Sequence, residues 1–332
     1  MTTIEPTMDW DKASALVREA QTVLIVTHVS PDGDAIGAML GLAHALRSQG
    51  KDVITAVDAG VPSKLAFLPG AETVLPALNG VTCDLVVAVD CGDEARMGAV
   101  GQVARRSAVP LINLDHHRTN TYFGDANLVD LDTVAAAEGV LDWLDRLGVP
   151  VDPAAAHCLL TGIVTDTLCF RTDRVTATTL AKAQRLMDAG VSLSDIVQNT
   201  VSRKPYAALR LWSAAMPAVH LEDHVIWAVI THEMFQQAQY PGNDDAGLVG
   251  MLVQTDEAYI AAVFRQREDG GIELGFRAVP GYDTSQVAVD LGGGGHPLAS
   301  GATVFGEPPE MLVPRVIDRL KAIVRSVSTP VT

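Results

Sequence analysis

The chain has 332 residues, 48% of them hydrophobic, and a formal net charge of −16. A chain of this length can bury a large core and is expected to hold two domains, which excludes an intrinsically disordered protein. The acidic balance excludes a protein that binds long duplex DNA through its phosphates, because that mode needs many lysines and arginines. A small anionic substrate held by metal ions remains compatible with this charge.

Cysteine usage and the lack of a targeting pattern predict the compartment. No two cysteines have the CxxC spacing, and three lie in or beside apolar runs, where a reduced thiol is typical. The chain shows no basic and apolar leader pattern and no uninterrupted apolar run of about 18 residues. We therefore expect a soluble, cytoplasmic protein with no membrane association. The four cysteines are Cys83, Cys91, Cys158 and Cys169.

Near-continuous apolar strands alternate with helical patterns in the first half of the chain. Gly50 and Gly190 follow two of the helices as stop signals, and Asp152 and Pro153 mark the start of another. This alternation predicts an α/β domain with a doubly wound, mainly parallel sheet, in which ligands bind beyond the carboxyl ends of the strands. The expected strands are 22–27, 52–57, 84–89 and 110–114, and the expected helices are 9–20, 35–48, 153–165 and 175–189.

The second half has a different pattern, which predicts a smaller α/β domain. A hairpin is expected around the turn Asp269-Gly270-Gly271, and the glycine run 292–295 is the one low-complexity stretch. Other expected elements are strands at 224–230, 259–267, 272–279 and 302–305, and helices at 285–290 and from Glu310 onward. The predicted domains are 1–191 and 219–332, joined by a helical linker at 192–218. No internal repeat is present.

One imidazole and two carboxylates follow the first predicted strand, in the stretch from Thr27 to Ala35. His28, Asp32 and Asp34 would meet at the end of that strand. Buried like charges raise one another's pKa, so two aspartates separated by one glycine in a cleft need solvent or cations. Taken alone, the stretch is equally well explained as a solvated Pro-Asp-Gly turn.

Three later stretches repeat this pattern and favour cations. Asp90 ends one apolar run, the triplet Asp115-His116-His117 ends another, and Asp166 follows the apolar run 158–164. Because the ends of parallel strands share one edge of the sheet, we expect these side chains to lie together. Mixed imidazole and carboxylate ligands suit Mn²⁺, or Mg²⁺ with less preference for histidine, and the lack of cysteine ligands counts against structural zinc.

These residues resemble the motifs of the DHH phosphoesterase superfamily, named after its Asp-His-His run. The four matching segments are HVSPDGDA (28–35), VAVD (87–90), LDHHRTN (114–120) and TGIVTDT (161–167). The segment GGGGHPLASG (292–301) resembles the glycine-rich substrate motif of the C-terminal domain in the nucleotide-cleaving branch. The size and motif order are most similar to bacterial nanoRNA phosphodiesterases, which also act on 3′-phosphoadenosine 5′-phosphate or on linear and cyclic dinucleotides.

The resemblance implies two divalent metal ions, with Mn²⁺ expected first and Mg²⁺ or Co²⁺ as alternatives. Asp90 would bridge the two ions, Asp115 would orient a ligand histidine, and His117 would face the substrate phosphate. The remaining metal ligands implied are His28 and Asp32 for one ion, and Asp34, His116 and Asp166 for the other.

The resemblance also implies a set of substrate-binding residues. Asn120 would contact a ribose or phosphate, Arg277 a terminal phosphate, and the glycines before His296 would form an anion-binding cradle of backbone N–H groups. Without the family, these positions would be a loop asparagine, an exposed strand residue and a flexible loop. The glycines of the cradle are Gly293, Gly294 and Gly295.

The implied activity is hydrolysis of short oligoribonucleotides, pApA or 3′-phosphoadenosine 5′-phosphate, with a homodimer left open. Two alternatives remain: an inorganic pyrophosphatase of the same superfamily, and a nucleotide sensor that binds without catalysis. The segment 202–204 (SRK) only partly matches the basic segment of the pyrophosphatases. The chain departs from the family pattern at 135–137 (AAA) and 168–169 (LC). The segment 275–278 (GFRA) also lacks the hydroxyl side chains that usually flank the family arginine, which leaves the substrate preference open.

Overall fold

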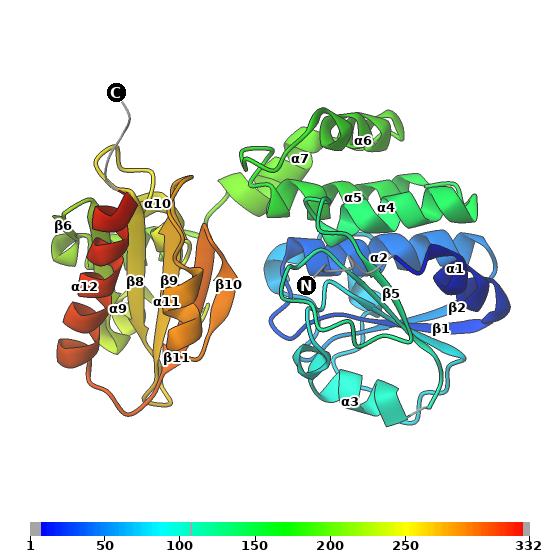
Figure 1. Ribbon diagram of the computed structural model, residues 1–332, viewed down its shortest axis with the longest axis horizontal. Coiled ribbons are helices and arrows are strands. Elements are labelled where there is room, and N and C mark those ends of the chain that lie inside the picture. The colour runs from blue at the N-terminus through cyan, green and yellow to red at the C-terminus, as the bar shows by residue number, and fades with distance from the viewer. Residues whose placement is uncertain (1–7, 107, 328–332) are drawn as a thin grey trace, which may run out of the picture. The chain divides into compact units, whose positions relative to one another are not determined.

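The computed structural model describes residues 8–106 and 108–327 (Figure 1). Contacts within the chain divide it into two units between Arg203 and Lys204, inside the segment 192–218 that the sequence predicts as a linker. Each unit is described here by itself. The predicted domains also contain residues outside the described ones, namely 1–7, 107 and 328–332.

A five-stranded parallel sheet forms the centre of the first unit, with strand order β2-β1-β3-β4-β5. Every residue of β3 and β4 is buried, as expected for apolar strands covered on both faces. The strands are β1 (Thr22–Val26), β2 (Asp52–Ala56), β3 (Leu85–Val89), β4 (Leu111–Asp115) and β5 (Ala126–Val129). The predicted parallel sheet is confirmed. The sequence did not predict β5, because its four residues include an asparagine and follow a polar loop.

Helices cover both faces of this sheet (Figure 1). The helices α2 and α4 lie on one face and α3 lies on the other, while α5 packs on α2 and α4 as a further layer. The helices are α1 (Trp10–Glu19), α2 (Gly33–Ser48), α3 (Gly98–Arg106), α4 (Ala136–Leu147), α5 (Pro153–Asp166), α6 (Ala177–Asp188) and α7 (Leu193–Val197). A π-helical turn, Gln198–Ser202, follows α7, and short 3₁₀ turns occur at Ser63–Leu65, Ala71–Thr73 and Glu94–Met97.

Glycines let α2 and α5 pack unusually closely. A Cβ atom at Gly37 would lie 2.5 Å from the carbonyl oxygen of Cys158, and one at Gly33 would lie 2.4 Å from Thr165 Oγ1. Backbone and buried side chains cannot yield that much space, so these positions of α2 exclude any side chain. The close packing brings the first turn of α2 beside the last turn of α5, where Asp166 lies.

The second unit contains a six-stranded mixed sheet, in the order β10-β11-β9-β8-β7-β6. Neighbouring strands are antiparallel except for the parallel pair of β7 and β8. The strands are β6 (His220–Glu222), β7 (Val225–Ile230), β8 (Ile260–Gln266), β9 (Ile272–Ala278), β10 (Gly294–His296) and β11 (Ala299–Val304). The predicted β8–β9 hairpin is present, and Arg267 N donates to Gly271 O across its turn. The last predicted strand begins three residues earlier than expected.

Helices pack on both faces of the second sheet, so the predicted two-domain α/β architecture is confirmed. One apolar core lies between the sheet and α11 and α12, and another lies between the sheet and α8, α9 and α10. The helices are α8 (Tyr206–Ala215), α9 (His232–Ala238), α10 (Leu248–Leu252), α11 (Ser285–Asp290) and α12 (Pro309–Val327), with a 3₁₀ turn at Met216–Ala218.

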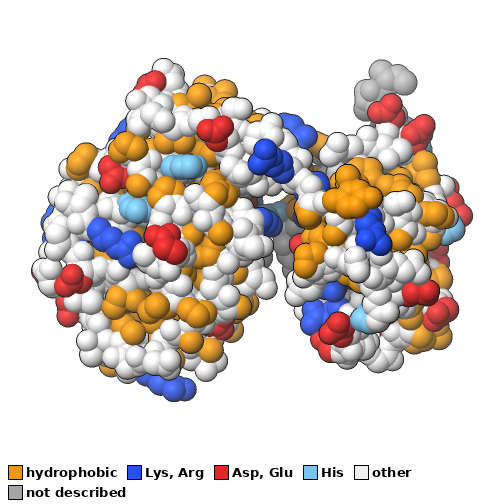
Figure 2. All heavy atoms as spheres, turned by 180° about the vertical axis from the view of Figure 1, so that it is seen from behind, with side chains coloured by type: hydrophobic (Ala, Val, Ile, Leu, Met, Phe, Trp, Pro, Cys, Tyr) orange, Lys and Arg blue, Asp and Glu red, His pale blue; other side chains and the backbone are white. Residues whose placement is uncertain are grey.

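Two surface properties bear on possible partners. Within residues 8–106 and 108–327, no helix has both the length and the apolar character needed to cross a bilayer. On the face that Figure 2 shows, Lys and Arg side chains are scattered among uncharged ones and form no continuous band. Long nucleic acids are bound by basic side chains clustered along one face, so this face lacks the charge pattern for that mode.

Candidate metal centre

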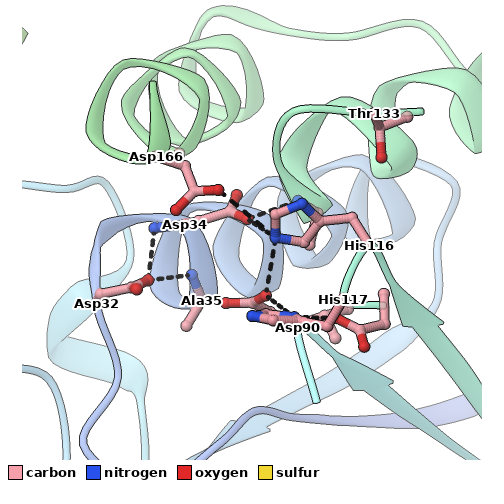
Figure 3. A network of polar contacts seen from close by, with 12 residues as sticks. Asp32, Asp34, Ala35, Asp90, His116, His117, Thr133 and Asp166 are labelled. Atoms are coloured by element: carbon pink, nitrogen blue, oxygen red, sulfur yellow. Dashed lines mark hydrogen bonds and ion pairs between the residues drawn. The ribbon is translucent and has the colours of Figure 1, made fainter. Parts of the chain in front are cut away.

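The loop after β1 positions two of the predicted ligands through the start of α2. Asp32 is the N-cap of α2, and its Oδ1 accepts hydrogen bonds from the backbone N–H groups of Asp34 (3.0 Å) and Ala35 (3.1 Å) (Figure 3). These two hydrogen bonds hold one oxygen of the Asp32 carboxylate in place. His28 Nδ1 lies 2.8 Å from the carbonyl oxygen of Val29, which orients the imidazole ring.

Asp34 is buried, and main-chain groups hold its carboxylate. Ala136 N donates to Asp34 Oδ2 (2.5 Å) and Ala137 N donates to Oδ1 (2.9 Å), both from the first turn of α4. Alanines therefore suffice at 136 and 137, because the donors belong to the backbone. Burial raises the pKa of Asp34 to about 7, and the charge of Asp32 adds to the shift.

Asp90 follows β3 and lies between two histidines. Its Oδ2 is 3.4 Å from His28 Nε2, and its Oδ1 is 3.6 Å from His116 Nε2. Asp90 Oδ1 is buried and accepts no hydrogen bond within residues 8–106 and 108–327. Burial, together with the charge of Asp34, raises the pKa of Asp90 well above its ordinary value.

Three carboxylates converge on one ring nitrogen of His116. The Nε2 atom lies 3.5 Å from Asp166 Oδ2, 3.6 Å from Asp90 Oδ1 and 3.8 Å from Asp34 Oδ2 (Figure 3). Asp166 is the last residue of α5, the helix that the sequence predicts over 153–165, whereas Asp90 and Asp115 lie at the ends of strands. The packing of α5 on α2 brings Asp166 to the same place.

The residue types and their spacing fit divalent cations. Two groups of side chains have ligand atoms that lie within 4.8 Å of one another, and Asp90 also groups with His116 and His117. A buried carboxylate oxygen without a donor, surrounded by other carboxylates, is costly unless a cation neutralises it. Hard oxygen ligands with some imidazole suit Mn²⁺ and Mg²⁺. The two groups are His28, Asp32 and Asp90, and Asp34, His116 and Asp166.

The partner of Asp115 is His117, and not the neighbouring histidine. Asp115 Oδ1 lies 2.7 Å from His117 Nδ1, so the carboxylate orients this ring. Burial alone would favour the neutral ring, but the hydrogen bond to Asp115 outweighs it and raises the pKa of His117. Burial would likewise raise the pKa of Asp115, yet hydrogen bonds from His117 and Asn120 lower it.

Asn120 supports Asp115 and does not reach outward. Its Nδ2 donates to Asp115 Oδ2 (2.6 Å) and to Asn113 Oδ1 (2.9 Å), and its Oδ1 accepts from Tyr122 N (2.6 Å). Asn120 is only 8% exposed. This placement does not support the expected contact of Asn120 with substrate. Sequence reasoning missed Asn113, although a polar asparagine inside the apolar strand β4 was the signal.

The predicted substrate residues of the second unit lie on neighbouring strands. Arg277 on β9 pairs with Ala299 on β11, and Ala299 pairs with His296 on β10. Laterally paired residues point to the same face, so Arg277 and His296 share a face, roughly 10 Å or two strand spacings apart. The small side chain of Ala299 lies between them.

The second half of the glycine run belongs to strand β10 (Gly294–His296), so the run is not the flexible loop that it would be without the family. A Cβ atom at Gly293 would lie 2.0 Å from Gly301 O, and one at Gly295 would lie 2.6 Å from Ala299 O. The backbone of Gly295 is at φ 129°. Both glycines are therefore required by the β10–β11 pairing. The missing side chain of Gly294 faces open space.

Known proteins share this combination of fold and motifs. Residues 22–163 match the family model described as DHH family, N-terminal domain. The bifunctional oligoribonuclease and PAP phosphatase NrnA of Thermus thermophilus is 32% identical over 320 residues, which cover 94% of this chain and 94% of that protein. The chain belongs to the DHH family. The Bacillus subtilis protein of the same description is 28% identical over 86% of this chain and 90% of that protein.

A solved structure shows the same fold. The exopolyphosphatase-related protein from Bacteroides fragilis has a TM-score of 0.88 and 23% sequence identity. The match covers 98% of this chain and 100% of that one. The predicted membership of the DHH family, in the branch of the NrnA proteins, is thus confirmed.

Proposed function

We propose that the protein is a metal-dependent phosphoesterase that hydrolyses short oligoribonucleotides and dinucleotides such as pApA to nucleoside monophosphates, and also 3′-phosphoadenosine 5′-phosphate. The observation that carries this proposal is the position of Asp90, which belongs to one ligand group and lies 3.6 Å from His116 of the other. The relatives described as bifunctional oligoribonuclease and PAP phosphatase supply the substrate class. Cyclic dinucleotides are a further candidate substrate.

The side chains divide the work between holding ions and handling the phosphate. Asp90 would be shared by two ions, one held with His28 and Asp32 and the other with the second ligand group. Two divalent ions, Mn²⁺ before Mg²⁺ or Co²⁺, would activate water and offset the charge on the reacting phosphate. His117, oriented by Asp115 through a hydrogen bond that raises the pKa of the ring, would donate a proton or stabilise negative charge at the phosphate.

The second unit would bind the part of the substrate that does not react. Arg277 offers a planar fork of donors, and His296 on the same face adds a second donor. Burial lowers the pKa of Arg277, but a guanidinium remains charged at any physiological pH. Backbone N–H groups of the glycine run would complete this phosphate site. A cytoplasmic location and a homodimeric assembly are also part of the proposal.

A substrate panel tests the activity. The full chain, loaded with Mn²⁺ or Mg²⁺, should hydrolyse pApA, oligoribonucleotides of about three to five nucleotides and 3′-phosphoadenosine 5′-phosphate, followed by product chromatography. An Asp90→Ala variant purified in parallel should be inactive, because the shared carboxylate is lost. Hydrolysis of pyrophosphate alone would instead identify a pyrophosphatase, and nucleotide binding without any hydrolysis would identify a sensor.

The role of Arg277 is tested by comparing two kinds of substrate. Arg277→Ala should lower kcat/KM for pApA about 10- to 150-fold, the loss expected for one charge-assisted hydrogen bond. Cleavage of bis(p-nitrophenyl) phosphate, a small activated diester, should stay near the wild-type rate. Arg267→Ala is the matched control, because this arginine of the same unit pairs with Asp269. Equal losses on both substrates would assign Arg277 to the fold instead.

A further inference from the structure

Arg96 is held beside the metal centre by its main chain. It lies on the 3₁₀ turn Glu94–Met97, which follows β3 and Asp90. Its N–H donates to Asp93 Oδ1 (3.1 Å), and its carbonyl oxygen accepts from Val29 N (2.7 Å). Because Val29 is adjacent to His28, this pair of hydrogen bonds ties the turn to the loop that carries a metal ligand.

Within residues 8–106 and 108–327, the guanidinium of Arg96 has one polar contact, and the atom that it meets is itself a donor. Its Nη2 lies 3.3 Å from His28 Nδ1, but that nitrogen also lies 2.8 Å from the carbonyl oxygen of Val29. A carbonyl can only accept, so Nδ1 carries the proton and Nε2 keeps the lone pair that faces Asp90. An arginine N–H and an imidazole N–H are both donors, so the contact between Arg96 and His28 is not a hydrogen bond.

Carboxylates do not compensate the charge of Arg96 either. Within residues 8–106 and 108–327, no carboxylate oxygen forms an ion pair with its guanidinium, although Glu94 on the same turn pairs with Arg105. Arg96 is exposed, so its donors are accessible from solvent. A fixed positive charge next to a ligand histidine also repels metal ions, and this repulsion weakens metal binding. An anion that arrives with the metals would offset this repulsion.

We infer that Arg96 binds a non-bridging oxygen of the substrate phosphate at the metal centre. This inference rests on the proposed function and adds a residue that the family motifs quoted above do not include. A guanidinium held at the edge of the site can donate two hydrogen bonds to a phosphate that the metals also contact. Unlike Arg277, it would act on the reacting phosphate, which every substrate shares. The sequence signal was a single arginine six residues after Asp90.

Binding and kinetics together test the inference. Arg96→Ala should weaken binding of AMP to the Mn²⁺-loaded protein about 10- to 150-fold by calorimetry, and kcat/KM should fall by a similar factor for pApA and for bis(p-nitrophenyl) phosphate alike. Mn²⁺ affinity should be unchanged or higher, since a repelling charge is gone. Arg96→Lys should recover only part of the loss, because lysine lacks the fork. Arg105→Ala is the control and should change neither binding nor rate.

Each other outcome overturns the inference. If Arg96→Ala lowers Mn²⁺ affinity in proportion to the rate, Arg96 positions His28 and does not bind substrate. If AMP affinity is unchanged in the folded Ala and Lys variants, or if the wild type binds neither AMP nor inorganic phosphate, the inference is wrong. A wild-type protein that binds AMP through Arg96 but hydrolyses nothing in the substrate panel contradicts the proposed activity alone.

Discussion

Adjacent residues of the Asp-His-His run have different surroundings. His116 is 2% exposed, and its Nε2 faces three carboxylates, whereas the His117 ring turns to Asp115. The two rings meet edge to face, with centroids 4.7 Å apart. Strand β4 ends at Asp115, so both histidines lie beyond its pleat and need not alternate regularly. Under the proposed mechanism, one sequence run would provide both a metal ligand and a proton donor.

Replacing each histidine separately should distinguish these roles. We expect His117→Ala to lower kcat by roughly 10²- to 10⁴-fold while Mn²⁺ content is retained, because a proton donor or charge stabiliser is lost. His116→Ala should lose Mn²⁺, since the three carboxylates then lack their shared imidazole. Metal content by atomic emission and single-turnover rates measure the two effects. Equal metal depletion in both variants would contradict this division.

At the scale of elements, the contact between α2 and α5 determines where the ligands stand. Gly162 of α5 faces the start of α2 and of α4, and a Cβ atom there would lie 2.6 Å from Ala137 Cβ and 2.7 Å from Asp34 Oδ1. The same close packing that stabilises the helix layer therefore also positions a metal ligand. Helix packing and ligand geometry cannot be changed independently at this point.

Adding one methyl group should show this coupling. Gly162→Ala should reduce Mn²⁺ affinity at least tenfold and lower the free energy of unfolding by about 1–3 kcal/mol, as overpacking does. Gly139→Ala in α4 is the matched control, because its new Cβ would meet the flexible side chain of Leu114 at 3.4 Å. That variant should be neutral or slightly stabilised, since alanine favours helix. Calorimetry and thermal unfolding measure both quantities; an unchanged Mn²⁺ affinity in Gly162→Ala would refute the coupling.

At the scale of the whole molecule, the metal centre buries part of the negative charge of a chain whose formal net charge is −16. Burial raises the pKa values of Asp34, Asp90 and Asp166, and their mutual repulsion adds to the shifts. A carboxyl group with a higher pKa in the folded protein binds more protons when folded. Its contribution to stability is therefore complete below its unfolded pKa, near 3.9, and is lost as the pH rises through its folded pKa.

The metal-free protein should accordingly be less stable at pH 8 than at pH 6. Asp34, with a pKa of about 7, contributes about 1.4 kcal/mol of this difference, or about 3–6 °C in Tm. Mn²⁺ should raise Tm more at pH 8, because it binds the deprotonated groups. Scanning calorimetry after chelation, with and without Mn²⁺, measures this, and Asp34→Asn should reduce the pH dependence. A metal-free Tm that rises between pH 6 and 8 would show that other groups dominate.

The sequence predicted those parts of the fold and site that rest on local pattern. Apolar runs ending in Asp90 and Asp115 are visible along the chain, and so is the Asp152 cap of α5, which accepts from Ala155 N. The helix α4 was not placed, because its start carries three alanines and no capping side chain. Asn120 was assigned to the substrate because spacing cannot show which way a side chain points. Arg96 was missed for the same reason. Its importance depends on the absence of a carboxylate partner for its guanidinium among the described residues, which spacing along the chain does not show.

The main-chain support of Asp34 has an implication for how this site can change. Two peptide groups of α4 hold the carboxylate, and their hydrogen-bond donors are identical for every amino acid except proline. An exchange at Ala136 or Ala137 to any residue except proline therefore leaves these donors in place. Replacing either alanine by glycine would keep both hydrogen bonds, although they hold a carboxylate of the metal centre. Because Ala136 and Ala137 are both buried, a larger side chain at either position would act on this carboxylate through packing, and only proline would act by removing a donor.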